Sequence, residues 1–241
     1  MATMTFTGTL VEKLTRTADS ASFRFSRPAD YHFEAGQSYS ITIPSPEGPL
    51  EHRFSHADSP TEGLTELTTR LTSSAFKNAL QALPLGSTAT FRGPAGRFLF
   101  RPQEPRIAFL IGGIGITPVR SMLRYLVDTQ GRGRVAGQEL VLFYGCMTED
   151  GIVYRDELDD FARVLPGLRV LYVITQPGMG WTGPRGYIDS RMVTSELGAP
   201  TDWTYYIVGP PPMIAAMDKL TTGLGIAGTR IIRENFVGYT S

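Results

Sequence analysis

The pattern of apolar and polar positions changes near residue 102. Before that point, short β-rich runs are each ended within a few residues by Gly, Pro, Asp or Ser. One helical interruption, Ser74–Leu83, places Phe76, Leu80 and Leu83 at helical spacing. The β-rich runs cover residues 5–14, 20–27, 38–44, 52–57, 64–70 and 87–92. This pattern predicts an antiparallel β-barrel or sandwich over residues 1–102.

After a proline-containing boundary segment, apolar runs typical of buried strands alternate over residues 103–241 with stretches that have the apolar spacing of helices. Apolar strands are predicted at 107–111, 139–144, 169–174, 204–208 and 229–233, and helices at 117–128, 154–165, 189–197 and 212–223. The alternation predicts a second domain, a doubly wound parallel sheet with helices on both faces. Ligands of such sheets gather at the carboxyl ends of the strands, where Gly112–Gly113, Gly145 and Gly209 follow predicted strands.

The segment Ile107–Pro118 is the most informative stretch of this second half. Five apolar residues are followed by three glycines, and then by Thr117 and Pro118, which we expect to cap and begin a helix. A strand, a glycine turn and a helix start favour a nucleotide pyrophosphate site, because free N–H groups and the helix dipole face an anion. The alternative is a plain turn whose glycines only allow close packing.

Composition narrows the chemistry. The 241 residues suffice for two cores, and 23 Lys and Arg balance 23 Asp and Glu, so no net charge favours nucleic acid. Cys146 is the only cysteine, which excludes an internal disulfide and an all-cysteine iron–sulfur cluster; with three histidines, we expect no metal site. No apolar run is long enough for a membrane span, and a cytoplasmic location is expected.

A second anion site is indicated in the first half. Arg53 offers a planar fork, Phe54 an aromatic face and Ser55 a neutral hydrogen bond. The helix start at Leu71–Ser74 adds hydroxyls and free N–H groups. Without that neighbouring helix start, the tripeptide would be read as a strand with an exposed arginine.

Five motifs share one order and spacing. They are Gly36-Gln37, Arg53-Phe54-Ser55, Gly93-Pro94-Ala95-Gly96, Gly112-Gly113-Ile114-Gly115-Ile116-Thr117-Pro118 and Gly209-Pro210-Pro211-Pro212-Met213. In this arrangement the chain resembles the ferredoxin–NADP(+) reductase-like flavoprotein superfamily over nearly its whole length. The resemblance implies an FAD-binding β-barrel, an NAD(P)-binding α/β domain and hydride transfer from NAD(P)H to FAD.

The resemblance also implies roles for particular residues. For FAD it implies that Arg53 is a pyrophosphate ligand, that Phe54 stacks on the isoalloxazine ring and that Ser55 places a hydroxyl near flavin N5. It further implies an FAD diphosphate segment with Arg70, Thr72, Ser73 and Ser74, and a nicotinamide-nucleotide loop with Gly112, Gly113, Gly115 and Thr117. Gly209, Pro210, Pro211 and Met213 resemble the motif beside the nicotinamide. Phe236, with Tyr239 as second choice, would cover the flavin, and Glu234 would join Ser55 in a catalytic role as polar support.

Three positions depart from the family pattern. The usual tyrosine is Phe54, which keeps the stacking surface but lacks the phenol, and a common cysteine before the Gly-Pro-Pro motif is Val208. Many NADPH-using members carry Ser-Arg after the third strand, where this chain has Thr175-Gln176. Glutamine cannot match a dianionic phosphate, so NADH is favoured, although nearby Arg185 could substitute.

The sequence therefore predicts an FAD-dependent NAD(P)H oxidoreductase that passes single electrons to a separate protein such as a ferredoxin. Two alternatives stay open. One is a flavin reductase or diaphorase acting on small acceptors, and the other is a non-catalytic flavin-binding electron-transfer subunit. Cys146 is read as a small buried hydrophobic residue in all three.

Overall fold

The computed structural model describes residues 2–129 and 137–235 of the chain. Its contacts divide the chain into two compact units. The first combines Met1–Phe100 with Thr117–Asp128, and the second combines Arg101–Ile116 with Thr129–Thr240. The first unit is therefore discontinuous in sequence, because it includes a helix that follows the first strand of the second unit.

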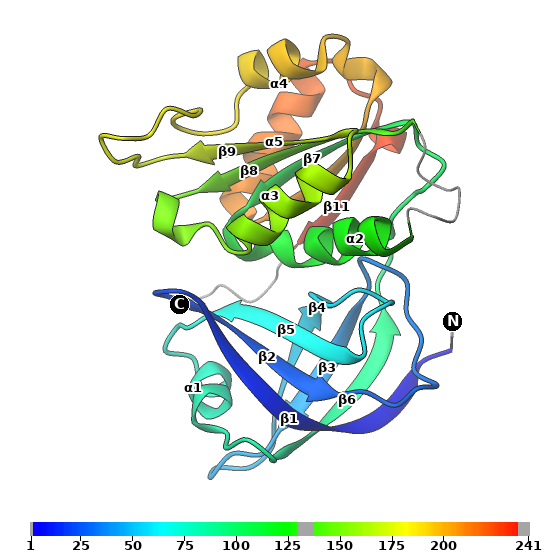
Figure 1. Cartoon of the computed structure of the whole chain (residues 1–241), viewed down its shortest axis with the longest axis vertical. Helices are drawn as coiled ribbons and strands as arrows, with labels where there is room; N and C mark the ends of the chain where they lie inside the picture. The colour runs from blue at the N-terminus through cyan, green and yellow to red at the C-terminus, as the bar shows by residue number, and fades with distance from the viewer. Residues whose placement is uncertain (1, 130–136, 236–241) are drawn as a thin grey trace. The chain divides into compact units, whose positions relative to one another are not determined.

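The first unit is built on one antiparallel sheet, which curves into a half-barrel (Figure 1). Its strands are β1 (Met4–Thr17), β2 (Ser20–Ser26), β3 (Ser38–Ile43), β4 (Leu50–Ser55), β5 (Leu64–Arg70) and β6 (Thr88–Ala95). They are ordered β4-β3-β6-β1-β2-β5. The antiparallel architecture predicted from the short, frequently broken β-rich runs is confirmed.

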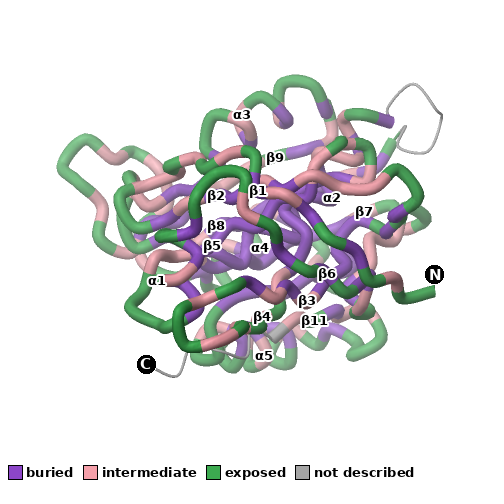
Figure 2. Tube along the Cα trace, turned by 90° about the horizontal axis from the view of Figure 1, so that it is seen from below, coloured by how far each residue is buried: buried purple, intermediate pink, exposed green. Residues whose placement is uncertain are grey.

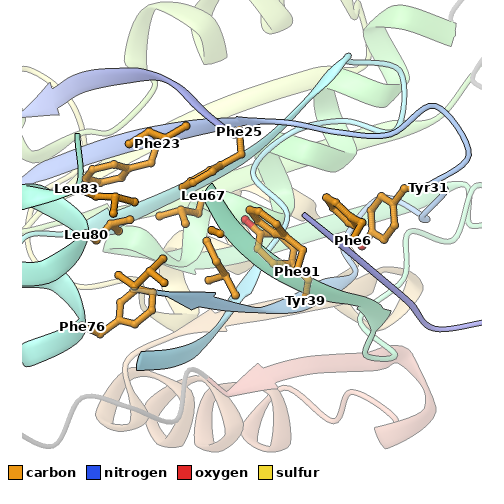
Figure 3. Close-up of a cluster of buried hydrophobic side chains, with 14 of the residues drawn as sticks. Phe6, Phe23, Phe25, Tyr31, Tyr39, Leu67, Phe76, Leu80, Leu83 and Phe91 are labelled. Atoms are coloured by element: carbon orange, nitrogen blue, oxygen red, sulfur yellow. The ribbon is translucent and has the colours of Figure 1, made fainter. Parts of the chain in front are cut away.

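Aromatic side chains fill the interior of this unit. Phe6 stacks on Phe91 with ring centroids 5.0 Å apart, and Phe25 meets Phe91 edge-on at 5.2 Å (Figure 3). Helix α1 (Ala75–Ala82) closes the cluster with Phe76 and Leu80. The helix begins where predicted, because the Ser74 hydroxyl accepts a hydrogen bond from a free backbone N–H of the first turn.

The second unit is a parallel sheet of β7 (Arg106–Gly112), β8 (Glu139–Cys146), β9 (Leu168–Ile174), β10 (Thr204–Gly209) and β11 (Ile231–Asn235). Their order is β11-β10-β7-β8-β9. Strand β7 therefore lies between β8 and β10, and the chain leaves it in one direction and returns on its other side. This reversal is the topological switch point at which doubly wound sheets bind ligands.

Helices cover both faces of this sheet, as predicted. Helices α4 (Ser190–Leu197) and α5 (Pro211–Gly223) pack on the face that carries Ala108 and Leu110 of β7. Helix α3 (Arg155–Val164) packs along β9 on the other face (Figure 1). Buried positions run along the strands and exposed positions along the connecting loops (Figure 2).

The turn after β7 differs from the prediction. Residues Gly113–Gly115 form a 3-10 turn that leads directly into α2 (Ile116–Thr129). Thr117 is therefore not the helix cap but lies inside the first turn, because the glycine turn is itself helical and its carbonyls accept the first N–H bonds. In the described part of the chain, no helix is both long and apolar enough to cross a membrane.

Candidate functional site: two candidate nucleotide sites

The first-unit motifs meet on three adjacent strands. Ser38 at the start of β3 pairs with Ser55 on β4 and with Ala95 on β6. The Arg53 guanidinium donates to Ser38 Oγ from Nε at 2.9 Å and from Nη2 at 2.7 Å. Ser38 Oγ in turn donates to the Ala95 carbonyl at 3.2 Å. The pairing thus brings together three motifs that are far apart in sequence.

The Arg53 side chain is suited to an anion. It is exposed and, among the described residues, has no carboxylate partner. Gly96 lies beside it with φ +94°, and a Cβ there would lie 3.2 Å from Arg53 Nη2. An arginine with no carboxylate partner next to exposed backbone fits a phosphate group.

Strand alternation sends Phe54 to the other face of β4. Its ring stacks on His52 at 4.7 Å and lies 5.7 Å from Phe76 of α1. His52 was not singled out from the sequence. A period-two reading of β4 would have indicated it, since residues two apart share a face. Ser55 is buried at the end of the strand.

The start of α1 carries the predicted diphosphate segment. Thr72, Ser73 and Ser74 are exposed, whereas the Arg70 guanidinium lies 3.7 Å from the Asp19 carboxylate. Lys77 is a cation that the sequence interpretation missed. Burial lowers the pKa of Lys77, and the nearby Arg70 charge lowers it further. No hydrogen bond joins Arg53 to residues 70–74 in the described chain, so the two groups are separate candidate anion contacts.

The second unit places its glycines in close contact with α5. A Cβ added at Gly112 would lie 2.2 Å from Met213 Sδ, and one at Gly209 would lie 2.7 Å from the same sulfur. A Cβ at Gly115 would lie 2.8 Å from the Val208 carbonyl oxygen. The ends of β7 and β10 and the start of α5 therefore meet at the switch point with no room for side chains.

This arrangement fits a dinucleotide. Gly113 adopts φ +51°, and Thr117 is buried in the first turn of α2. Pro210 precedes α5 and Pro211 begins it, so the exposed start of that helix offers fewer N–H donors than an ordinary helix. The glycine turn after β7 therefore stays the predicted source of N–H donors at this edge.

The end of β9 carries the residues expected to select between NADH and NADPH. Thr175 and Gln176 donate backbone N–H bonds to Cys146 and Met147 at 3.0 and 2.8 Å, and the Gln176 side chain is exposed. Arg185 is exposed, and its Nη2 donates to the Trp181 carbonyl. The backbone pairing continues the β8–β9 ladder and holds the glutamine at the carboxyl edge of the sheet.

Arg155, at the start of α3, was not predicted to contribute to this edge. Its guanidinium lies 5.6 Å from the Tyr172 ring and 5.8 Å from the Trp181 ring. The Tyr172 hydroxyl donates to Asp159 at 2.7 Å; burial raises the pKa of that phenol, and the carboxylate raises it further. Aromatic rings at the edge of a doubly wound sheet suit a flat adenine or nicotinamide ring.

The last described strand carries Glu234. Its partner in the parallel register is Val208, the position at which many superfamily members have a cysteine. Phe236 and Tyr239 lie outside the described residues. Cys146 is buried, as expected, and among the described residues no group of three or more His, Cys, Asp or Glu side chains could hold a metal ion.

Comparison with known proteins points to one class. Residues 109–219 match the model of the family described as "Oxidoreductase NAD-binding domain". NADH-cytochrome b5 reductase 1 of Aspergillus terreus is 34% identical over 158 residues, covering 64% of this chain and 53% of the relative. The protein of the same name from Pyricularia oryzae is 35% identical over 159 residues, covering 64% and 50%. The chain spans about half the length of the curated relatives it matches.

Solved structures share the whole fold. The cytochrome b5 reductase domain of Ulva prolifera nitrate reductase superposes with a TM-score of 0.83 at 24% identity, covering 96% of this chain and 97% of that domain. A ferredoxin NADP+ reductase from Neisseria gonorrhoeae, solved with bound FAD and NADP, gives 0.82 at 18% identity, covering 96% and 98%. These structures show that the chain has the two-unit fold that the resemblance to the ferredoxin–NADP(+) reductase-like superfamily implied.

Proposed function

We propose that the chain is an FAD-dependent NAD(P)H oxidoreductase. Residues 1–102 bind FAD, and residues 103–241 bind the nicotinamide nucleotide. The observation that carries the proposal is the close packing of Gly112 and Gly209 against Met213, which joins the ends of β7 and β10 to the start of α5 at the switch point, where doubly wound sheets bind ligands. The matching oxidoreductase NAD-binding family over residues 109–219 supports the same assignment.

FAD would be held by cationic, hydroxyl and aromatic side chains of the first unit. Arg53 supplies a charged fork for one phosphate, and the hydroxyls of Ser73 and Ser74, with Arg70 and Lys77, supply the second anion contact. Phe54 provides the aromatic surface, and Ser55 a neutral hydroxyl for the flavin ring. Thr72 completes the hydroxyl-rich segment.

The nicotinamide nucleotide would lie against the second unit. The backbone of Gly112, Gly113 and Gly115, followed by Thr117, receives its pyrophosphate, and Thr175 and Gln176 face its adenosine end. Gly209, Pro210, Pro211 and Met213 line the nicotinamide side. Phe236 would cover the flavin, and Glu234 would serve as a polar group near it.

Bound FAD would supply the redox chemistry, accepting a hydride from NAD(P)H together with one proton and releasing the two electrons singly. The protein itself needs no strong general base for hydride transfer. Its residues bind, orient and exclude water, and Ser55 holds a hydrogen bond at the reacting ring. A site with few ionisable side chains agrees with that role.

We infer NADH as the preferred donor, because Gln176 carries no charge for a 2′-phosphate and both quoted curated relatives are NADH-dependent by name. The acceptor is a separate one-electron protein, for which a ferredoxin or a cytochrome b5 is the candidate. Nucleic acid is not expected as a partner. A cytoplasmic location stays an expectation from composition.

The test is an anaerobic titration of FAD-reconstituted protein with NADH and with NADPH, following the flavin absorbance near ~450 nm. Bleaching by stoichiometric NADH is the expected result. Protein that retains no FAD would exclude both enzyme functions. Protein that retains FAD without bleaching would favour the non-catalytic electron-transfer subunit.

A second assay distinguishes between acceptors. The reduced protein is mixed with a ferredoxin, a cytochrome b5 or ferricyanide, and turnover is compared at equal acceptor concentration. We expect a protein acceptor to give the higher kcat/KM. Equal or better turnover with the small acceptor alone would support the diaphorase alternative.

A further inference from the structure

A buried polar cluster begins at the residue after Ser55. The His56 ring is fully buried and stacks on Phe33 with centroids 3.6 Å apart. His56 Nδ1 lies 2.9 Å from Asp58 Oδ1, and Tyr31 Oη lies 3.1 Å from His56 Nε2. Neither the sequence motifs nor the proposed function uses this cluster. Burying so many polar groups is costly unless each has a partner.

Asp58 is the centre of the cluster. Its carboxylate accepts hydrogen bonds from Nη1 of Arg27 at 2.8 Å and from the backbone N–H of Glu66 at 2.9 Å. The backbone N–H of His56 donates to the Gln37 carbonyl at 2.9 Å, which joins the cluster to the Gly36-Gln37 motif. Residues 56–62, called here the 56–62 segment, are therefore fixed from the half-barrel side.

Helix α2 holds the same segment from its other side. Nη1 of Arg120 donates to the Ala57 carbonyl at 2.9 Å, and the same guanidinium donates to both oxygens of Glu62, at 2.5 and 3.1 Å. The hydroxyl of Ser121 donates to the Asp58 carbonyl at 2.6 Å. Arg120 is 2% exposed, so burial of its guanidinium reduces the screening of these bonds by water.

The next residue of α2 extends the contact. A Cβ added to Gly36 would lie 2.4 Å from Met122 Cε, so the helix presses on the glycine turn that precedes β3. Gly36 has φ +97°, a conformation that other residues rarely adopt. Helix α2 thus contacts both chain segments that flank the paired strands β3 and β4.

The connectivity gives this contact a functional meaning. The 56–62 segment follows Phe54 and Ser55 without a break, and α2 follows the Gly113–Gly115 turn without a break. A planar guanidinium bonded to both oxygens of one carboxylate fixes direction as well as distance. Within the first unit, Arg120 therefore ties α2 to the segment that directly follows Ser55.

We propose that Arg120 is a positioning residue that, with Glu62, holds the 56–62 segment and so fixes Ser55 relative to the first turn of α2. The role rests on the proposed function, because it concerns the residues assigned to FAD and to the nicotinamide nucleotide. Arg120 touches neither cofactor in this role. It acts through the backbone of Ala57 and the carboxylate of Glu62.

The first test needs no cofactor. Hydrogen exchange of the apo protein is compared for wild type, Arg120→Lys and Arg163→Lys. The lysine at 120 keeps the charge but loses the fork, while Arg163 is an exposed arginine on α3, paired with Asp160. Amides of the 56–62 segment should exchange about tenfold faster in Arg120→Lys only. Unchanged exchange would overturn the proposal.

The second test separates positioning from stability. Under anaerobic single-turnover conditions, Arg120→Lys should reduce the limiting rate of flavin bleaching by NADH at least about tenfold per bound FAD. Its FAD content and its NADH concentration dependence should stay close to those of Arg163→Lys. Faster exchange with an unchanged limiting rate would mean a purely structural role and would reject positioning. If Arg120→Lys does not fold, Glu62→Gln provides the same comparison.

The outcomes keep the two claims distinct. If wild-type protein does not bleach with NADH, the proposed function fails, and the exchange experiment still decides whether Arg120 holds the 56–62 segment. If wild type bleaches normally and Arg120→Lys bleaches at the same rate, only the positioning role fails.

Discussion

Gly112 and Met213 are in such close contact that a Cβ on the glycine would lie 2.2 Å from the methionine sulfur. One residue ends β7 and the other lies in the first turn of α5, about a hundred positions later. The same sulfur would lie 2.7 Å from a Cβ on Gly209 at the end of β10. Met213 therefore occupies the space left by two glycines on adjacent strands.

Replacing Gly112 with alanine should displace Met213 from this position. Overpacking of a close contact typically costs ~1–3 kcal/mol, and we expect Gly112→Ala to lose that much free energy of unfolding. Urea denaturation monitored by tryptophan fluorescence measures it. The KM for NADH should rise because the backbone next to the nucleotide moves.

The double variant Gly112→Ala with Met213→Ala is the matched control. Removing the sulfur opens the space that the added methyl group needs, so the double variant should be more stable than the sum of the two single changes predicts. Additive losses would show that the contact does not limit substitution at Gly112.

Gln176 should limit the use of NADPH. Gln176→Arg supplies a charged fork at the exposed end of β9, and we expect kcat/KM for NADPH to rise roughly tenfold while that for NADH changes little. Steady-state kinetics with both donors measures the ratio. A selective loss of NADPH turnover in Arg185→Ala would instead show that Arg185 already performs this task.

Lys77 should make FAD affinity depend on alkaline pH. Burial, and then the Arg70 charge, lower the pKa of Lys77 below its ordinary value of 10.5. A diphosphate favours the charged form of Lys77. Binding of FAD therefore takes up a proton at any pH where Lys77 of the apo protein is already partly neutral. FAD affinity should therefore fall as pH rises through the window just below 10.5.

Lys77→Met should flatten this dependence, as measured by quenching of flavin fluorescence between about pH 8 and about pH 10.5. The stability of the apo protein should depend on pH with the opposite sign. The unfolded chain binds more protons than the folded one in the same window, so the stability of the apo protein rises with pH there. The exposed Lys219→Met variant is the control, and an equal slope in both variants would contradict the prediction.

The fold was predictable because each half repeats its own pattern of apolar and polar positions. Short runs such as Leu64–Arg70 alternate with breakers, and the apolar strand at 107–111 is followed by a helical period, so two architectures separate without tertiary information. The discontinuous first unit was not predictable. Its inclusion of α2 depends on Arg120, Ser121 and Met122 finding partners about sixty or more positions away, which no local pattern records.

The sequence indicated glycine positions where close packing excludes a side chain, as at Gly112. Charged and polar residues that lie near the candidate sites were harder to predict. Lys77 and Arg155 became apparent only when helix packing showed their neighbours, whereas the alternation along β4 already indicated His52. The start of α2 was predicted one residue late, because the glycine-rich turn before it, Gly113–Gly115, is itself helical.

Arg53 and His52 lie next to each other in sequence but on opposite faces of β4, and their substitution should separate two parts of FAD binding. Arg53→Ala removes a charge-assisted contact, which is worth ~1.5–3 kcal/mol, so FAD affinity should fall roughly 10- to 100-fold. His52→Ala removes the ring stacked on Phe54 and should change the flavin absorbance spectrum more than the affinity.

Both effects are measured by titrating apo protein with FAD while recording full spectra. Arg163→Ala, an exposed arginine paired with Asp160 on α3, controls for loss of positive charge. If Arg53→Ala kept wild-type affinity for FAD and His52→Ala lost much of it, the phosphate contact would instead lie on the face of β4 that packs on α1.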